Sequence, residues 1–369
     1  MRRLLLVLSL GVVVVSPSIT SADRLPADPS PVKQASPAPG AEPQANPDPH
    51  EPLRRFDPDA PPTGDTRFML SDLTIFRLNP VGLETRARLG FQKRMYYSEK
   101  AIGKNNFWFA GLYPKLNPAS AQLGVGGELQ PASILNVKVF GELQKYFGTF
   151  GYMQSFDSVA PTTNYSDARL KMMRDDPMTE PQTATIMHLG VAPLLQIKIA
   201  KNKIALRALT QLDYWDASNI RAGETSFYEP TFDTLLPDKG WTLAMDNDLL
   251  YTGAPNLAVG LRHTWVHPFY KREHFATQAE FDAYDGENSH HRLGLFLART
   301  FRDDGPSRFN KPTLVVILSW YLTHKYRAGE PGTLPTGHTG DDYISRGKPY
   351  VVVGFAFESD FMAVSKTMM

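Results

Sequence analysis

The feature that most restricts the fold of this chain is a regular alternation of apolar and polar residues in long stretches of its sequence. The clearest stretch runs from residue 81 to residue 94. Its alternate positions separate into an apolar set and a charged set: Leu83, Ala87, Leu89 and Phe91 against Glu84, Arg86, Arg88 and Arg94. Because successive side chains of a β-strand point to opposite faces, this period of two predicts a strand with one apolar and one polar face.

Twelve such stretches follow one another after residue 66, at residues 67–78, 81–97, 105–114, 119–129, 133–147, 184–200, 203–217, 241–252, 256–270, 290–302, 312–324 and 348–361. Most of them reach the roughly 9–11 residues that a tilted strand needs to cross the hydrocarbon of a membrane. Strands of soluble proteins average about 5–6 residues. The lengths therefore predict an all-β fold, an antiparallel transmembrane β-barrel of about twelve strands.

The links between these stretches have a parity that places both chain ends on one side of the membrane. Links after even-numbered stretches are short, at 98–104, 130–132, 201–202, 253–255 and 303–311. The four longest links all follow odd-numbered stretches, at 148–183, 218–240, 271–289 and 325–347, and only the turns at 79–80 and 115–118 are short on that side. Membrane barrels have short periplasmic turns and longer extracellular loops. The parity therefore predicts that the N- and C-termini are both periplasmic.

Two of the long links contain signals for short helices. Thr277 and Glu280 have the spacing of a capping box for a helix over 278–284, which Gly286 would end. Residues 167–174 are rich in methionine and basic residues and predict a second helix. This second helix either folds inward as a constriction or covers the rim of the barrel.

Aromatic residues gather toward the ends of the predicted strands. One group lies toward the predicted outer rim: Tyr146, Phe147, Tyr214, Trp215, Trp241, Trp265, Trp320 and Tyr321. The other lies toward the predicted inner rim: Tyr96, Tyr97, Phe107, Trp108, Tyr251, Phe301 and Tyr350. Two belts of amphipathic rings are typical of the two membrane interfaces, whereas a soluble exported β-protein would place such rings in its core.

The N-terminal part of the chain has a different character. Arg2 and Arg3 precede an apolar run from Leu4 to Val15, and small residues up to Ala22 follow, which predicts a cleaved signal peptide over residues 1–22. Residues 23–66 are rich in proline and predict a disordered periplasmic spacer, so that residues 67–369 form the barrel. The sequence has no cysteine, which excludes a lipoprotein and disulfide bonds.

Residues 67–361 resemble the bacterial outer-membrane β-barrel class, and the run from Lys348 to Phe361 resembles the final strand that such proteins close with an aromatic residue. The run departs from that pattern because residues 362–369 follow the aromatic residue. The resemblance implies outer-membrane lipid as the surroundings and the barrel-assembly machinery as a partner of the last strand. The formal net charge of +1 gives no support to nucleic acid as a partner.

If the apolar face of the barrel meets lipid, the charged face lines the interior. The candidates for lumen-lining residues are Glu84, Arg86, Arg88, Arg94, Glu128, Lys138, Glu142, Lys198, Arg207, Asp213, Asp246, Asp248, Arg262 and Arg292. Two interpretations stay open. The charges either pair across the barrel and plug it, or line a narrow path that favours a small anionic solute. We expect a non-enzymatic barrel that acts as a narrow pore, a transporter or a structural or surface-interaction protein.

The alternative is an outer-membrane lipid-modifying hydrolase of the phospholipase or deacylase type. Such an enzyme needs a nucleophile, a histidine base and an orienting polar group. The residues of suitable chemistry are Ser289, His290, His291, His263 and His267. The His-x-Ser pattern with a nearby Asn is absent, and His290 and His291 with Glu287 do not converge on a metal because adjacent strand residues point to opposite sides. The sequence therefore assigns no catalytic residue, no metal site and no cofactor.

Overall fold

The computed structural model of the protein describes residues 66–217, 219–303, 309–328 and 348–362. The predicted signal peptide, residues 1–22, lies outside the described residues, and so does the predicted spacer except for its last residue. That residue, Thr66, is the first residue of strand β1. The chain after Met362 and most of the predicted link 325–347 also lie outside the described part.

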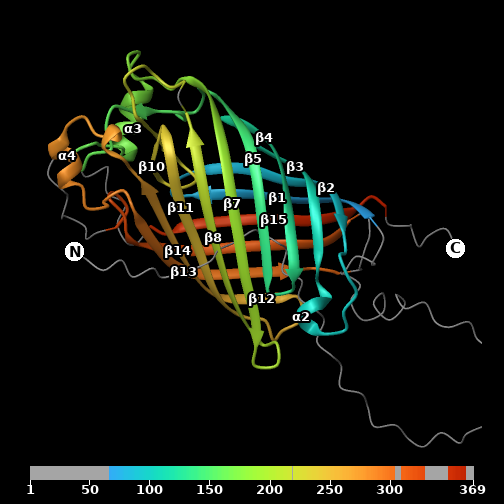
Figure 1. Ribbon diagram of the computed structural model, residues 1–369. Helices are drawn as coiled ribbons and strands as arrows, with labels where there is room; N and C mark the ends of the chain where they lie inside the picture. Colours follow the sequence, from blue (N-terminus) through green and yellow to red (C-terminus); the bar gives the residue numbers. More distant parts are fainter. Residues whose placement is uncertain (1–65, 218, 304–308, 329–347, 363–369) are drawn as a thin grey trace, which may run out of the picture.

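Twelve strands form one closed antiparallel barrel in the order β1-β15-β14-β13-β12-β11-β8-β7-β5-β4-β3-β2 (Figure 1). Their bounds are Thr66–Leu78 (β1), Gly82–Lys93 (β2), Phe107–Asn117 (β3), Ser120–Ala132 (β4), Leu135–Phe147 (β5), Thr183–Ile199 (β7), Ile204–Asp216 (β8), Lys239–Tyr251 (β11), Leu257–Phe269 (β12), His290–Thr300 (β13), Asn310–Thr323 (β14) and Tyr350–Asp360 (β15). Each predicted stretch overlaps one of these strands, so the predicted twelve-stranded antiparallel barrel is confirmed.

The wall of the barrel is apolar on the outside and more polar on the inside. Leu123, Val125, Val139 and Leu143 on the outside of β4 and β5 are between 56% and 62% exposed, whereas Glu142 between them is 3% exposed. An exposed apolar surface that follows alternate residues around a closed wall is suited to contact with lipid chains. No helix in the described residues is long and apolar enough to span a membrane.

Some strand ends differ from the prediction. Strand β2 ends at Lys93 because the Asn106 side chain accepts hydrogen bonds from the backbone N–H groups of Met95 and Tyr96, at 3.0 and 2.9 Å, and takes this segment out of the wall. The short helix α2, Ala101–Lys104, follows. Strands β3 and β4 run on through the predicted links at 115–118 and 130–132, which shortens both turns.

A small folded cap, which the sequence did not predict as a sheet, covers one end of the barrel. It contains a three-stranded sheet in the order β10-β9-β6, formed by Ser155–Phe156 (β6), Ser226–Glu229 (β9) and Thr234–Pro237 (β10). The predicted helices are confirmed as Asp167–Arg174 (α3) and Gln278–Ala283 (α4), and the Thr277 side chain accepts a hydrogen bond from the Glu280 N–H. In Figure 1, α3, α4 and β10 lie at one end of the barrel and α2 at the other.

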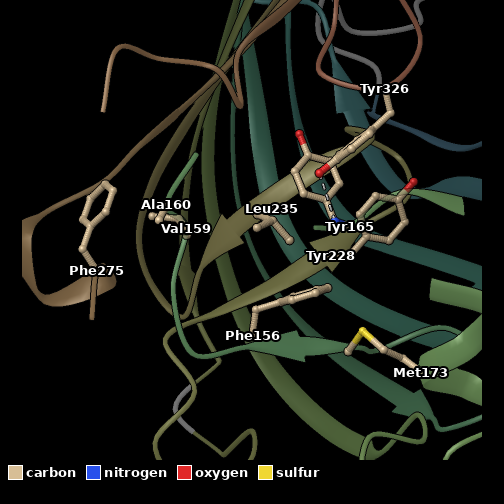
Figure 2. Packing of buried hydrophobic residues seen from close by; sticks show 9 residues of the cluster. All are labelled: Phe156, Val159, Ala160, Tyr165, Met173, Tyr228, Leu235, Phe275 and Tyr326. Carbon is tan, nitrogen blue, oxygen red and sulfur yellow. Dashed lines mark hydrogen bonds between the residues drawn. The ribbon is translucent and has the colours of Figure 1, made fainter. Parts of the chain in front are cut away.

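The cap has its own apolar core. Phe156, Tyr228 and Leu235 of the small sheet pack with Tyr165 and with Tyr326, and each of these side chains is at most 8% exposed (Figure 2). Met173 of α3 and Phe275 join the same cluster. Its members come from all four long links, so the described parts of these links pack together.

The predicted aromatic belts are only partly present. Trp241 and Phe147 near the cap are 45% and 42% exposed, and Tyr251 at the other end is 48% exposed. The prediction was wrong for Tyr146, Trp215 and Tyr321, which are at most 4% exposed because the cap covers them from inside. It was also wrong for Tyr350, which lies at the capped end because β15 starts there, opposite Ser319.

Candidate functional site in the capped barrel

The turn of one hairpin crosses the barrel at its capped end. This hairpin, called the cap hairpin, consists of β9, β10 and the turn of residues 230–233. On one side, Tyr146 of β5 donates a hydrogen bond to the Glu229 carboxylate; on the other, Tyr321 of β14 donates one to Asp233, at 2.6 Å. Strands β5 and β14 are six strands apart in either direction around the barrel, so the hairpin reaches opposite walls.

Asp233 is the anchor of the cap hairpin. Its carboxylate accepts hydrogen bonds from the Tyr228 hydroxyl at 2.7 Å, from Tyr321 and from Arg327, and His324 Nε2 lies 2.8 Å from its backbone oxygen. Burial by itself raises the pKa of Asp233, but Arg327 and His324 outweigh burial and hold the pKa of this carboxyl well below its usual range. The anchor is therefore charged at any physiological pH.

Arg327 ties the hairpin to the remaining loops. Its guanidinium contacts Asp167 of α3 with two bonds of 2.8 and 2.9 Å, and it donates to the Asn79 side chain at 2.8 Å. Arg77 at the end of β1 donates to the Pro230 oxygen at 3.2 Å. Paired arginine and carboxylate forks are among the stronger polar contacts in proteins. The cap is thus fastened to the wall by buried charges as well as by its apolar core.

Below the cap, a first chain of ion pairs follows the wall from β3 to β8. Lys115 Nζ lies 2.7 Å from Glu142, and Nδ1 of His188 lies 3.2 Å from the same carboxylate. Nε2 of His188 lies 2.8 Å from Asp213, and its ring stacks on Trp215 with 3.9 Å between ring centres. The polar partners of Glu142 and Asp213 thereby offset the cost of burying both carboxylates away from water.

A second chain of ion pairs joins β8, β11 and β12. Arg262 holds Asp248 with two bonds of 2.7 and 2.8 Å and lies 3.3 Å from Asp246. Arg207 lies 3.6 Å from Asp248 on the other side. The side chain of Asp248 is 0% exposed, so two guanidinium groups replace its water shell.

Several cations of the interior lie over aromatic rings. Arg88 lies 3.5 Å from the ring centre of Phe109, and Lys138 lies 3.9 Å from that of Tyr113. Arg292 lies 3.9 Å from the ring of Tyr350. Such contacts are favourable when the cation is shielded from water, and the rings also fill the space between charges.

The remaining predicted residues take different places. Arg88 also pairs with Glu128 at 2.8 Å, and Arg86 pairs with Glu84 on the same strand. Arg94 is 1% exposed and donates to the backbone oxygen of Lys104, the last residue of α2, at 2.5 Å. Lys198 is exposed and lies at the uncapped end of the barrel, where α2 also lies. Among the described residues of the wall, the ion pairs that we find join strands at most two positions apart, so they run along the wall and not across the bore.

Sequence reasoning missed several of the connecting residues. Lys115 fell in a predicted turn, and Arg77, Asp233 and Arg327 lie at strand ends or in loops, where no alternation marks them. His188 could have been found, because it shares its face of β7 with the buried Ile186 and Ala192.

The histidines considered as catalytic candidates separate into two faces of the wall. His290 is 1% exposed and lies against Tyr321 inside, whereas His263, His267 and His291 share the outward face with the exposed Leu261. His263 Nε2 lies 3.1 Å from His291 Nδ1. His267 Nδ1 lies 2.6 Å from the hydroxyl of Ser289, a side chain that the sequence did not pair with it. The described residues contain no group of three or more potential metal ligands.

The described architecture, a closed antiparallel barrel with an apolar outer wall, is that of bacterial outer-membrane β-barrel proteins. No protein-family model matches the chain, and no curated protein matches it. Among solved structures, it is similar to the NanC porin, with 9% identity over 79% of this chain and 100% of that chain and a TM-score of 0.33. It is also similar to Omp33 of Acinetobacter baumannii, with 8% identity, 80% and 98% coverage and a TM-score of 0.31. It is similar as well to LpxR from Salmonella typhimurium, with 8% identity over 79% of this chain and 100% of that chain and a TM-score of 0.33.

Proposed function

We propose that this protein is an outer-membrane barrel that is closed at rest, in which the cap hairpin acts as the gate of a narrow pore. The observation that carries the proposal is the contact of the cap hairpin with two opposite walls, where Tyr146 donates to Glu229 and Tyr321 donates to Asp233. A hairpin held across the bore blocks the passage of solutes, and a small folded element of this kind can be released from the wall as a unit.

The same proposal includes the orientation and the export of the chain. The long links carry the cap, and the first and last strands start and end at the opposite end, so we place the cap outside the cell and both termini in the periplasm. Residues 1–22 act as a signal peptide and residues 23–66 as a spacer in this proposal. The last strand, β15, would be the contact with the barrel-assembly machinery.

Conductance in planar bilayers tests the gate. We expect the intact chain to stay closed and a variant with residues 226–237 replaced by a short glycine-serine link to show steady steps of conductance. Closure of both proteins would mean that the wall residues themselves fill the bore, and steady conductance of the intact chain would mean that the hairpin does not block it; either result overturns the proposal.

For the open variant we propose a small anionic solute. Arg86, Arg88 and Lys138 lie on the charged face, and Lys138 is directed to a ring rather than paired with a carboxylate in the described part of the chain. In a salt gradient, the reversal potential should indicate anion preference and should change sign when Arg86 and Arg88 are both replaced by Glu. An unchanged reversal potential would remove β2 from the path.

The contact between His267 and Ser289 favours a second candidate function, a lipid hydrolase. In such a reaction the Ser289 oxygen would attack an ester carbonyl, His267 would take the hydroxyl proton and return it to the leaving alcohol, and water would then release the fatty acid. Within the described residues, the other nitrogen of His267 has no carboxylate partner, so the orienting group of a triad is missing.

Release of fatty acid from phospholipid micelles tests this candidate. If the intact chain is active, His267→Ala and Ser289→Ala should each lower the rate by about 100-fold or more. His290→Gln is the matched control, because His290 is adjacent in sequence but lies on the inner face. No fatty acid release by the intact chain, or equal loss in all three variants, would reject the hydrolase.

A further inference from the structure

An apolar groove of about 620 Å³ lies on the wall across β7, β8, β11, β12 and β13. The strand register explains it. One residue from each of the five strands is the register partner of the next, so that together they form a single row: Leu195, Ala208, Asn247, His263 and Leu293. The small Ala208 side chain and the Asn247 amide lie in the middle of that row, between longer side chains, so the wall is hollowed there.

The neighbouring row forms one side of the groove. It consists of Leu206, Leu249 and Leu261, which are 40%, 49% and 46% exposed and therefore belong to the outward face. The volume lies within the range of roughly 300–1,000 Å³ that is common for small-molecule sites. The groove therefore lies on the outward side of the wall, which would face the membrane.

Polar side chains stand where the surroundings are hydrocarbon. Asn247 lies between the exposed Trp241 toward the cap and the exposed Tyr251 at the other end of β11. No hydrogen-bond partner of the Asn247 amide is found within the described residues, and His263 beside it contacts only His291 by a polar atom there. An amide without a partner in hydrocarbon is costly, and polar groups at this depth are usually functional.

The polar side chains continue toward the capped rim. His291 lies opposite Trp265, and their rings are parallel. Closer to the capped rim, His267 contacts Ser289, and His267 is two residues from Phe269, the last residue of β12. From Phe269 to His263 is six residues, or about 15 Å along the membrane normal at the usual rise and tilt of barrel strands. The outward wall therefore offers polar contacts near the interface and again near the middle of the membrane.

From this arrangement we infer that the groove binds one acyl chain of a membrane lipid, and that Asn247 and His263 hydrogen-bond a hydroxyl group on that chain. The inference depends on the membrane location in the proposed function. A second copy that met this wall through the same row would place one hollow against another and leave the groove empty. A lipid chain is narrow enough to run from the rim along β12 into the groove, with its ester oxygens near His267 and Ser289 and its middle near His263 and Asn247.

Photo-crosslinking tests this site on the full chain in vesicles of phosphatidylethanolamine with a trace of the same lipid bearing a diazirine in its acyl chain. We expect the label on β8, β11 and β12. A competing phospholipid with a mid-chain hydroxyl should displace the label about tenfold better than the same lipid without the hydroxyl, since two hydrogen bonds distinguish them.

Three variants give the site its controls. Ala208→Phe fills the groove and should abolish the label there, whereas Asn247→Leu should keep the label and remove the tenfold difference between competitors. Thr85→Leu, an outward residue of β2 on another part of the wall, should change neither. Uniform labelling around the barrel, equal competition in the intact chain, or crosslinks to a second copy would each overturn the inference. Insertion and gating measured on the same vesicles would report on the proposed function separately.

Discussion

Replacement of Asp248 by alanine is expected to lower the free energy of unfolding by about 3–5 kcal/mol, because it leaves two buried guanidinium groups without their shared carboxylate. Arg262 holds Asp248 with two hydrogen bonds, and Arg207 lies on its other side. The loss should be seen as a lower midpoint in urea titration of the barrel refolded into lipid vesicles. The size of the effect comes from the burial of the cations more than from the strength of the lost bonds.

The matched control is Asp175→Ala, which breaks an ion pair with Arg174 on the surface of the cap. Its carboxylate side chain is 61% exposed, so water replaces the lost partner and the urea midpoint should stay that of the intact chain. A double variant, Asp248→Leu with Arg262→Met, should recover part of the lost stability, because the guanidinium that holds Asp248 by two hydrogen bonds is removed together with the carboxylate. If Asp248→Ala proves as mild as Asp175→Ala, water must reach this part of the interior.

Replacement of Asp233 by alanine is expected to detach the cap hairpin while the wall stays folded. The carboxylate is the common acceptor of Tyr228, Tyr321 and Arg327, so its loss leaves three buried donors unsatisfied at a cost of about 3–5 kcal/mol to the cap. Hydrogen exchange should rise in residues 226–237 and remain slow in the barrel strands. The same variant should show openings in planar bilayers.

The pH dependence of this anchor follows from the depressed pKa of Asp233. A carboxyl whose pKa is lowered in the folded state adds stability above its ordinary pKa and loses it only as pH falls through the lower folded value. The protection of the hairpin amides against hydrogen exchange should therefore not change through titration of Asp233 between pH 8 and pH 5. This range lies above the ordinary aspartate pKa of about 4. A hairpin that loosens sharply across this range, together with an Asp233→Asn variant that does not, would contradict the assignment of Asp233 as a charged anchor.

The barrel could be predicted because each of its strands can be recognised from a pattern in its own stretch of sequence. The alternation of Leu83 to Arg94 depends only on the fact that one face of the wall meets an apolar medium and the other does not. The cap could not be predicted in the same way. Strands β6, β9 and β10 are two to four residues long and buried on both faces, so they carry no period.

The charged residues of the interior were predicted as a set, but not their partners. Arg88 pairs with Glu128 two strands away, and Lys115 reaches Glu142 across β4. Such pairs depend on the stagger between strands, which sequence alternation does not contain. The contact between the outward His267 and Ser289 was missed for a different reason, because nearly the whole link between β12 and β13 separates the two residues.

The sequence by itself determined the number of strands, the face that each turns outward and the end at which the long links gather. These properties follow from side-chain polarity and from lengths measured along the chain. Only the tertiary structure decided that the described parts of the links fold into a cap and that Asp233 and Tyr321 meet although 88 residues separate them. It also decided that Ala208 and Asn247 lie between longer side chains and hollow the outer wall. Those features arise where strands close into a barrel and bring distant residues to the same height, which no local pattern records.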